Sequence, residues 1–74
     1  MRGIVDRKGE QFAYLQGKKV YTLDGEPTGS VEGEFIIDLA GNRMWRLVGD
    51  GIYALDGSET IGYLSSERPS NYDL

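Results

Sequence analysis

The sequence contains no cysteine and no histidine among its 74 residues. This excludes disulfide bonds, metal sites built from thiolate or imidazole ligands, and catalytic arrangements that pair histidine with serine or cysteine. A domain this small is usually stabilised by disulfide bonds or a bound metal, or else by very regular packing or a partner subunit. Regular packing or oligomerisation therefore remains as the source of stability, and on size alone the chain forms one domain.

Long hydrophobic runs and an excess of basic charge are missing too. The first residues carry charges with no apolar stretch behind them, and no segment reaches membrane-spanning length. We therefore expect a cytoplasmic protein without membrane contact. The net charge of −4 opposes binding to phosphate backbones, so nucleic acid is not an expected partner. No window holds a helical period, because glycine interrupts each one, and we expect almost no helix.

Glycine, by contrast, is abundant and periodic. One series of glycines recurs every sixteen residues, and a second series has the same spacing: Gly9, Gly25, Gly41 and Gly57, then Gly17, Gly33 and Gly49. Such self-similarity indicates repeated supersecondary units. The units are residues 1–16, 17–32, 33–48 and 49–64.

Each unit predicts a β-hairpin. A β-branched residue precedes the first glycine series in every unit, at Ile4, Val20, Ile36 and Ile52. Leu23-Asp24-Gly25 and its equivalents in units three and four predict chain reversals at glycine, while Arg7-Lys8-Gly9 departs from this pattern. The second strands carry apolar residues at alternate positions, with Trp45 and Leu47 in one unit and Ile61 and Tyr63 in the last. The second glycine series then joins hairpin to hairpin.

Two hairpin turns fit the sequence, a two-residue type I′ turn or a three-residue type I turn with a glycine bulge. With the bulge, the first-strand residues Tyr21, Ile37 and Tyr53 share the apolar face of the second strands. Without it, Ile36 and Ile52 do. We prefer the bulged form because it gathers more apolar residues on one face.

The predicted fold is all-β, with four tandem sixteen-residue hairpins over residues 1–64 closed around a pseudo-fourfold axis. Closure removes the unpaired edges that a row of hairpins would expose. The alternative is a linear β-meander whose edges are capped by oligomerisation. Residues 65–74 break the period and are mostly polar, and we expect a mobile tail there.

The repeat, most regular in Tyr21-Thr22-Leu23-Asp24-Gly25 and Tyr53-Ala54-Leu55-Asp56-Gly57, resembles the bacterial four-fold β-flower family over residues 1–64. The resemblance implies hairpins arranged like petals and brings no established activity, cofactor or catalytic residue. A more distant similarity to MORN repeats is weak, because those units are longer and have a Gly-aromatic-Gly spacing that is missing here.

Carboxylates are the only abundant residues that could perform chemistry. The aspartates beside the turns, Asp24 and Asp56 among them, match no calcium-binding loop, and turn formation is the preferred account of them. Pairs such as Asp56 and Glu59 lack a concave site that would perturb their pKa. We therefore predict no metal, no cofactor and no enzyme, and we rank a carboxylate-only enzyme last among the hypotheses.

Trp45 stands between Arg43 and Arg46 at a position where the other units have smaller residues. It either fills the centre of the ring or is an exposed anchor, and these three residues are the candidate interface or ligand contacts. The strand tyrosines are expected to pack across strands. The leading hypothesis is a non-catalytic module that acts through self-association or contact with a protein partner. The alternative is a small-ligand binding module around Trp45.

Overall fold

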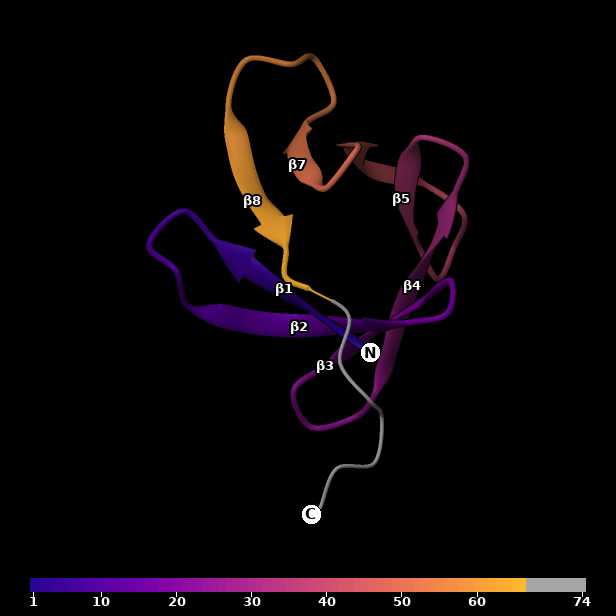
Figure 1. Ribbon diagram of the computed structural model, residues 1–74. Helices are drawn as coiled ribbons and strands as arrows, with labels where there is room; N and C mark the ends of the chain where they lie inside the picture. Colours follow the sequence, from indigo (N-terminus) through magenta and orange to yellow (C-terminus); the bar gives the residue numbers. More distant parts are fainter. Residues whose placement is uncertain (67–74) are drawn as a thin grey trace.

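A computed structural model describes residues 1–66 and contains eight antiparallel strands. Each strand pairs with the next, and β8 pairs with β1, so the sheet closes on itself (Figure 1). The strands are β1 (Arg2–Asp6), β2 (Gln11–Gln16), β3 (Lys19–Thr22), β4 (Pro27–Glu32), β5 (Phe35–Asp38), β6 (Arg43–Val48), β7 (Gly51–Ala54) and β8 (Thr60–Leu64). The predicted all-β closed fold is confirmed, and the linear meander is wrong because the β1–β8 pairing leaves no edge.

The connections between hairpins are two-residue turns that begin with glycine. Gln16 pairs with Lys19 across Gly17-Lys18, and Gly17 has a φ of 63°. A positive φ at the first central position alone defines a type II′ turn, whose twist suits antiparallel strands. Gly33 and Gly49 repeat this geometry, each with a φ of 61°.

Within each hairpin the strands are joined by a longer connection. These are loop 1 (residues 7–10), loop 2 (23–26), loop 3 (39–42) and loop 4 (55–59). In loop 1 the Gly9 N–H donates to the Asp6 carbonyl at 3.0 Å, and the Asp6 N–H donates to the Glu10 carbonyl at 2.9 Å. With Gly9 at a φ of 87°, this is a type I turn followed by a glycine bulge. Loops 2 and 3 repeat both bonds, so the turn preferred from the sequence is the one present.

A side chain at the end of the first strand stabilises these loops. Asp6 Oδ1 accepts hydrogen bonds from the backbone N–H groups two and four residues ahead, at 2.9 and 3.0 Å, and Asp38 does the same in loop 3. The sequence predicts this role for Asp24 and Asp56. Asp56 accepts one such bond, from the Ser58 N–H, whereas the Asp24 side chain makes no hydrogen bond within residues 1–66.

A second bulge in every hairpin decides which face is buried. Ile4 pairs with Ala13, but Val5 pairs with Gln11, so that Phe12 is an extra residue in β2. The same shift occurs in the other three hairpins, at Thr28, Met44 and Ile61. Each bulge allows two consecutive side chains to lie on the inner face of the ring.

The inward placement of Tyr21, Ile37 and Tyr53 that we inferred from the first bulge is therefore wrong. The second bulge shifts the register back by one residue, and a shift of one residue exchanges the two faces of a strand. Ile36 is consequently 1% exposed, while its neighbour Ile37 is only partly buried.

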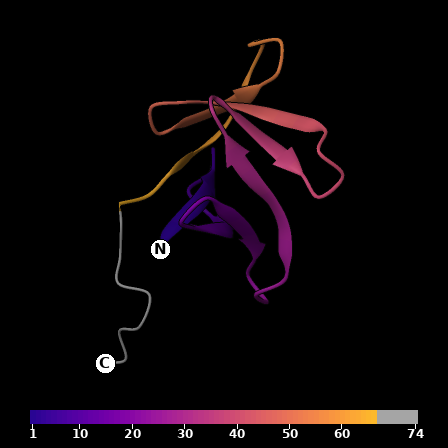
Figure 2. The same ribbon diagram turned by 90° about the vertical axis from the view of Figure 1, so that its right-hand side faces the viewer.

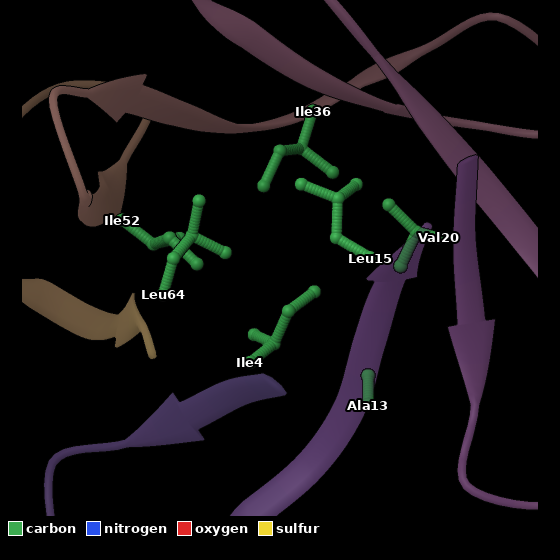
Figure 3. Close-up of a cluster of buried hydrophobic side chains, with 7 residues drawn as sticks. All are labelled: Ile4, Ala13, Leu15, Val20, Ile36, Ile52 and Leu64. Carbon is green, nitrogen blue, oxygen red and sulfur yellow. The ribbon is translucent and has the colours of Figure 1, made fainter. Parts of the chain in front are cut away.

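The core is a belt of β-branched side chains, one from each hairpin (Figure 3). These four are at most 2% exposed, and they are Ile4, Val20, Ile36 and Ile52. Ala13, Leu15 and Leu64 complete the buried cluster, and partly buried side chains including Trp45 pack against it. Because the belt draws on all four hairpins, no hairpin buries its inner face alone.

The fourth hairpin departs from the sixteen-residue period by one residue. In loop 4 the Ala54 N–H donates to the carbonyl five residues ahead, at Glu59, whereas the equivalent bond in the other loops spans four residues. The extra residue shifts all of β8, so that Gly62 and Leu64 are buried, whereas Tyr63 is 47% exposed. The prediction that Ile61 and Tyr63 share the inward face is therefore wrong for Tyr63, whereas Ile61 is the bulge residue of β8 and packs against the core cluster.

The two ends of the described chain close the ring together. The Ser65 N–H donates to the Gly3 carbonyl at 2.9 Å, and the Gly3 N–H donates to the Ser65 hydroxyl at 2.8 Å. Arg2 donates to the Ser65 carbonyl and to Asp50 Oδ1, both at 2.8 Å. The segment 65–74, which the sequence predicts to be a mobile tail, thus begins with Ser65 bound to the ring. Residues 67–74 of this segment lie outside the described residues.

Candidate functional site

The end of the ring that carries loops 1–4, here called the loop end, exposes apolar side chains. In a closed ring of antiparallel strands, alternate connections lie on opposite rims, so the four loops share one rim and the type II′ turns share the other. The hairpins splay apart like petals, and loops 1, 2 and 4 point to the left, bottom and top of Figure 1 (Figures 1 and 2). Leu23, Leu39 and Leu55 begin loops 2, 3 and 4 and are 58%, 72% and 43% exposed. A leucine at the first loop position is not required by the turn, so the turn does not explain why exposed leucines recur there.

The four loops differ sharply in charge. Loop 1 holds Arg7, Lys8 and Glu10, which sum to +1, and loop 3 holds no charged residue. Loop 2 holds two acidic residues, Asp24 and Glu26, and loop 4 also holds two, Asp56 and Glu59. The loop end therefore presents one basic loop between two acidic neighbours, with a neutral loop opposite.

Local hydrogen bonds lower the pKa of two aspartates, Asp38 at the end of β5 and Asp56 in loop 4. The Asn42 N–H, with smaller contributions from Ala40 and Gly41, lowers the pKa of Asp38 below its ordinary value. The hydroxyl and N–H of Ser58 lower the pKa of Asp56. A lowered pKa suits turn-forming carboxylates and not general acids, which need a raised one.

An apolar cleft of about 230 Å³ opens inside the ring beside the core. Its walls are contributed by hairpins 1, 2 and 3, and its lining residues are Ile4, Phe12, Ala13, Val20, Thr22, Thr28, Met44 and Trp45. Trp45 reaches the bulge residue Phe12 of another hairpin, with ring centroids 6.2 Å apart and perpendicular planes. Ala13 and Gly29, the equivalents of Trp45 in hairpins 1 and 2, leave the space that the indole partly fills.

The residues predicted as contacts, Arg43, Trp45 and Arg46, do not share one face. Trp45 packs inward against the core cluster. The guanidinium carbons of Arg43 and Arg46 lie 4.0 and 5.6 Å from the centroid of the Phe35 ring, and Arg46 is 3.5 Å from Glu34 Oε1. The arginines thus form a cation–π cluster with Phe35, away from the cleft, whose lining contains no charged residue.

Grooves between hairpins bring further charged and apolar groups together. The groove between hairpins 1 and 4 is lined by both basic residues of loop 1 and by Glu59. The groove between hairpins 3 and 4 joins Leu55 to Trp45. Among the tyrosines, Tyr14 and Tyr21 stack across strands with ring centroids 5.3 Å apart, in the packing role that we expected.

Other kinds of site find no support in the part of the chain that the structure describes. No group of three or more acidic side chains is arranged to hold a metal ion within residues 1–66. No helix in the same residues could span a lipid bilayer.

Comparison with known families matches residues 2–49 to the family described as 4-fold beta flower protein. The chain belongs to this family. The matched segment contains the first three hairpins of the flower, including the degenerate loop 1, and it stops before the fourth hairpin with its longer loop. Comparisons with curated proteins and with solved structures gave no match.

Sequence reasoning missed the loop leucines and Phe12 as candidate contacts. The signal was present in the Leu-x-Gly repeat, where turn chemistry demands only the glycine. An apolar residue repeated at a position that the turn leaves free indicates a surface requirement.

Proposed function

We propose that this β-flower protein is a non-catalytic module that acts through protein contacts at its loop end, chiefly by self-association. The observation that carries the proposal is the exposure of leucine at the same position in three of the four loops. Isolated apolar residues are normal on protein surfaces, but a repeated set at one end of a symmetric ring is typical of an interaction surface.

The small core supports the same proposal. Within residues 1–66 only eight hydrophobic side chains are buried, and domains of this size gain much from burying further apolar area against another subunit. The whole chain lacks histidine and cysteine, so carboxylates are the remaining candidates for acid–base catalysis. The pKa values of Asp38 and Asp56 are lowered, which is the wrong direction for a general acid. We therefore propose no catalytic activity. A bacterial source and a cytoplasmic location, which the family resemblance and a cysteine-free chain favour, belong to the proposal.

Sedimentation equilibrium over a wide range of protein concentration tests this function. We expect the wild-type chain to form dimers or larger assemblies, and the Leu39→Ser variant to shift the equilibrium toward monomer. The matched control is Val48→Ser, because Val48 is 53% exposed but lies at the opposite end of the ring. A wild-type monomer at every concentration would refute self-association, as would equal effects of the two substitutions.

A second candidate function, binding of a small apolar ligand, is favoured by the cleft beside Trp45. A volume near 230 Å³ is adequate for a ligand of one aromatic ring, since apolar cavities of about 150 Å³ bind benzene. Titration with toluene, followed by the methyl NMR signal of Met44, should give saturable shifts. The Ala13→Leu variant fills the cleft and should abolish them, and unchanged binding by this variant would place the ligand elsewhere.

A further inference from the structure

We propose that two copies of the chain associate loop end to loop end, with loop 1 of each copy against loop 2 of the other. This inference rests on the proposed self-association and specifies its geometry. The partner is a second copy, and the recognition elements are one basic loop, one acidic loop and the exposed leucines.

Symmetry limits how two such rings can meet. A twofold axis lying in the interface reverses the order of loops around the ring. Loop 1 can therefore face loop 1, 2, 3 or 4 of the second copy, and each choice fixes the other pairs. If loop 1 faces loop 1, basic meets basic and acidic loop 2 meets acidic loop 4. If loop 1 faces loop 3, each acidic loop meets its own copy.

Charge therefore selects the two remaining arrangements. With loop 1 facing loop 2 or loop 4, opposite charges meet twice, because the axis generates each contact in duplicate. Like charges across an interface are costly and complementary ones set the relative orientation of the partners. Loop 3 carries no charge and accepts either remaining partner.

The grooves of the ring favour loop 2 over loop 4 as the partner of loop 1. In loop 4, Glu59 already shares a groove with Arg7 and Lys8 of its own chain, and the Asp56 carboxylate accepts a hydrogen bond from Ser58. In loop 2, the Glu26 N–H donates to the Thr22 hydroxyl, but the carboxylates of Asp24 and Glu26 have no ion pair and no hydrogen bond within residues 1–66. Loop 2 therefore presents two carboxylates without a partner in the described residues, whereas in loop 4 Asp56 is hydrogen-bonded and Glu59 lies in the groove beside the basic residues of its own chain.

This arrangement also places apolar groups against each other. When loop 1 faces loop 2, loop 3 faces loop 4, so Leu39 of one copy meets Leu55 of the other. The leucines supply the burial that holds the copies together, and the charged loops set the register. Each copy keeps its own ring intact, since the loop residues are outside the buried core.

A charge-swap experiment tests this pairing. Variant A is Arg7→Glu with Lys8→Glu, and variant B is Asp24→Lys with Glu26→Lys. Each variant alone places like charges at both loop contacts, so we expect its dimer Kd in sedimentation at low salt to rise about tenfold or more. An equimolar mixture of A and B restores opposite charges at both contacts, and we expect heterodimers at nearly the wild-type Kd.

Two controls separate the pairing from general charge effects. Lys18→Glu with Lys19→Glu changes the net charge as variant A does, but at the other end of the ring, and should leave the Kd within about twofold. Variant C is Asp56→Lys with Glu59→Lys, and it should not restore dimers when mixed with A.

The outcomes distinguish this inference from the proposed function on which it rests. Restoration by C and not by B would overturn the loop 1 to loop 2 pairing. Wild-type dimers that are insensitive to all the charge changes would overturn it too, while leaving self-association intact. A monomeric wild-type chain would overturn both.

Discussion

Two neighbouring isoleucines in β5 give the sharpest test of the fold. Ile36 belongs to the central belt and is 1% exposed, whereas Ile37 is partly buried on the outer face. Replacing either one with alanine changes the same residue type in the same strand. Intrinsic strand preference is therefore nearly equal in the two variants, and the difference between them reports burial.

The expected magnitude follows from what each substitution removes. Isoleucine to alanine deletes three carbons, worth about 2.4 kcal/mol at about 0.8 kcal/mol for each buried carbon. The cavity that remains raises the cost in a rigid core to about 2–5 kcal/mol. We expect Ile36→Ala to lose about 3 kcal/mol, and Ile37→Ala to lose about 1 kcal/mol because Ile37 lies on the outer face and is only partly buried.

Equilibrium urea unfolding, followed by far-ultraviolet circular dichroism, measures the free energy of unfolding of each variant. A domain of this size has a total stability of about 3–10 kcal/mol, so Ile36→Ala approaches the limit of folding. Ile36→Val, with an expected loss of about 1 kcal/mol, remains measurable if the alanine variant fails to fold. Equal losses at the two positions, or a larger loss at Ile37, would refute the double-bulge register.

Three further predictions concern two strand glycines, the Asp38 carboxylate and the contact between Phe12 and Trp45. Gly29→Ala should lower the free energy of unfolding by about 2–3 kcal/mol, because the added Cβ would overlap a backbone carbonyl oxygen of the neighbouring strand. Gly3→Ala, whose Cβ meets only side-chain atoms, should lower it by less than about 1 kcal/mol. Urea unfolding measures both, and equal losses would contradict this reasoning. The lowered pKa of Asp38 stabilises the fold above the unfolded-state pKa of about 3.9, and this contribution disappears as the pH falls through the folded-state value. Asp38→Asn should therefore have a flatter stability profile than wild type below about pH 4, and parallel profiles would contradict the turn role. Finally, a double-mutant cycle of Phe12→Leu and Trp45→Leu should give a coupling energy of about 0.5–1.5 kcal/mol for their edge-to-face contact, and additive effects would show that the rings do not interact.

The sequence contains the signals for the loop leucines and for Trp45, but it suggests other roles for some of these residues. The sequence pattern assigns the loop leucines to the turn, although the turn requires only glycine at positive φ. Trp45 was placed correctly as the unusual member of its repeat position, and its flanking arginines were grouped with it because they are adjacent in sequence. Arg46 follows the inward Trp45 and faces outward as strand alternation requires, whereas Arg43 faces outward because the bulge at Met44 adds a residue between it and Trp45. Both guanidinium groups then lie against the Phe35 ring on the outer surface.

The sixteen-residue period, the glycine turns and the closed all-β ring follow from the sequence alone, because these features depend on local backbone requirements repeated in every unit. Glycine is needed wherever φ is positive, and four equivalent hairpins remove unpaired edges by closing. The tertiary structure alone decided which face is core and how the last strand is aligned. Both depend on single-residue shifts, the bulges at Phe12 and its equivalents and the extra residue in loop 4. A shift of one residue leaves composition and periodicity almost unchanged while exchanging the two faces of a strand, so only the pairing between strands reveals it.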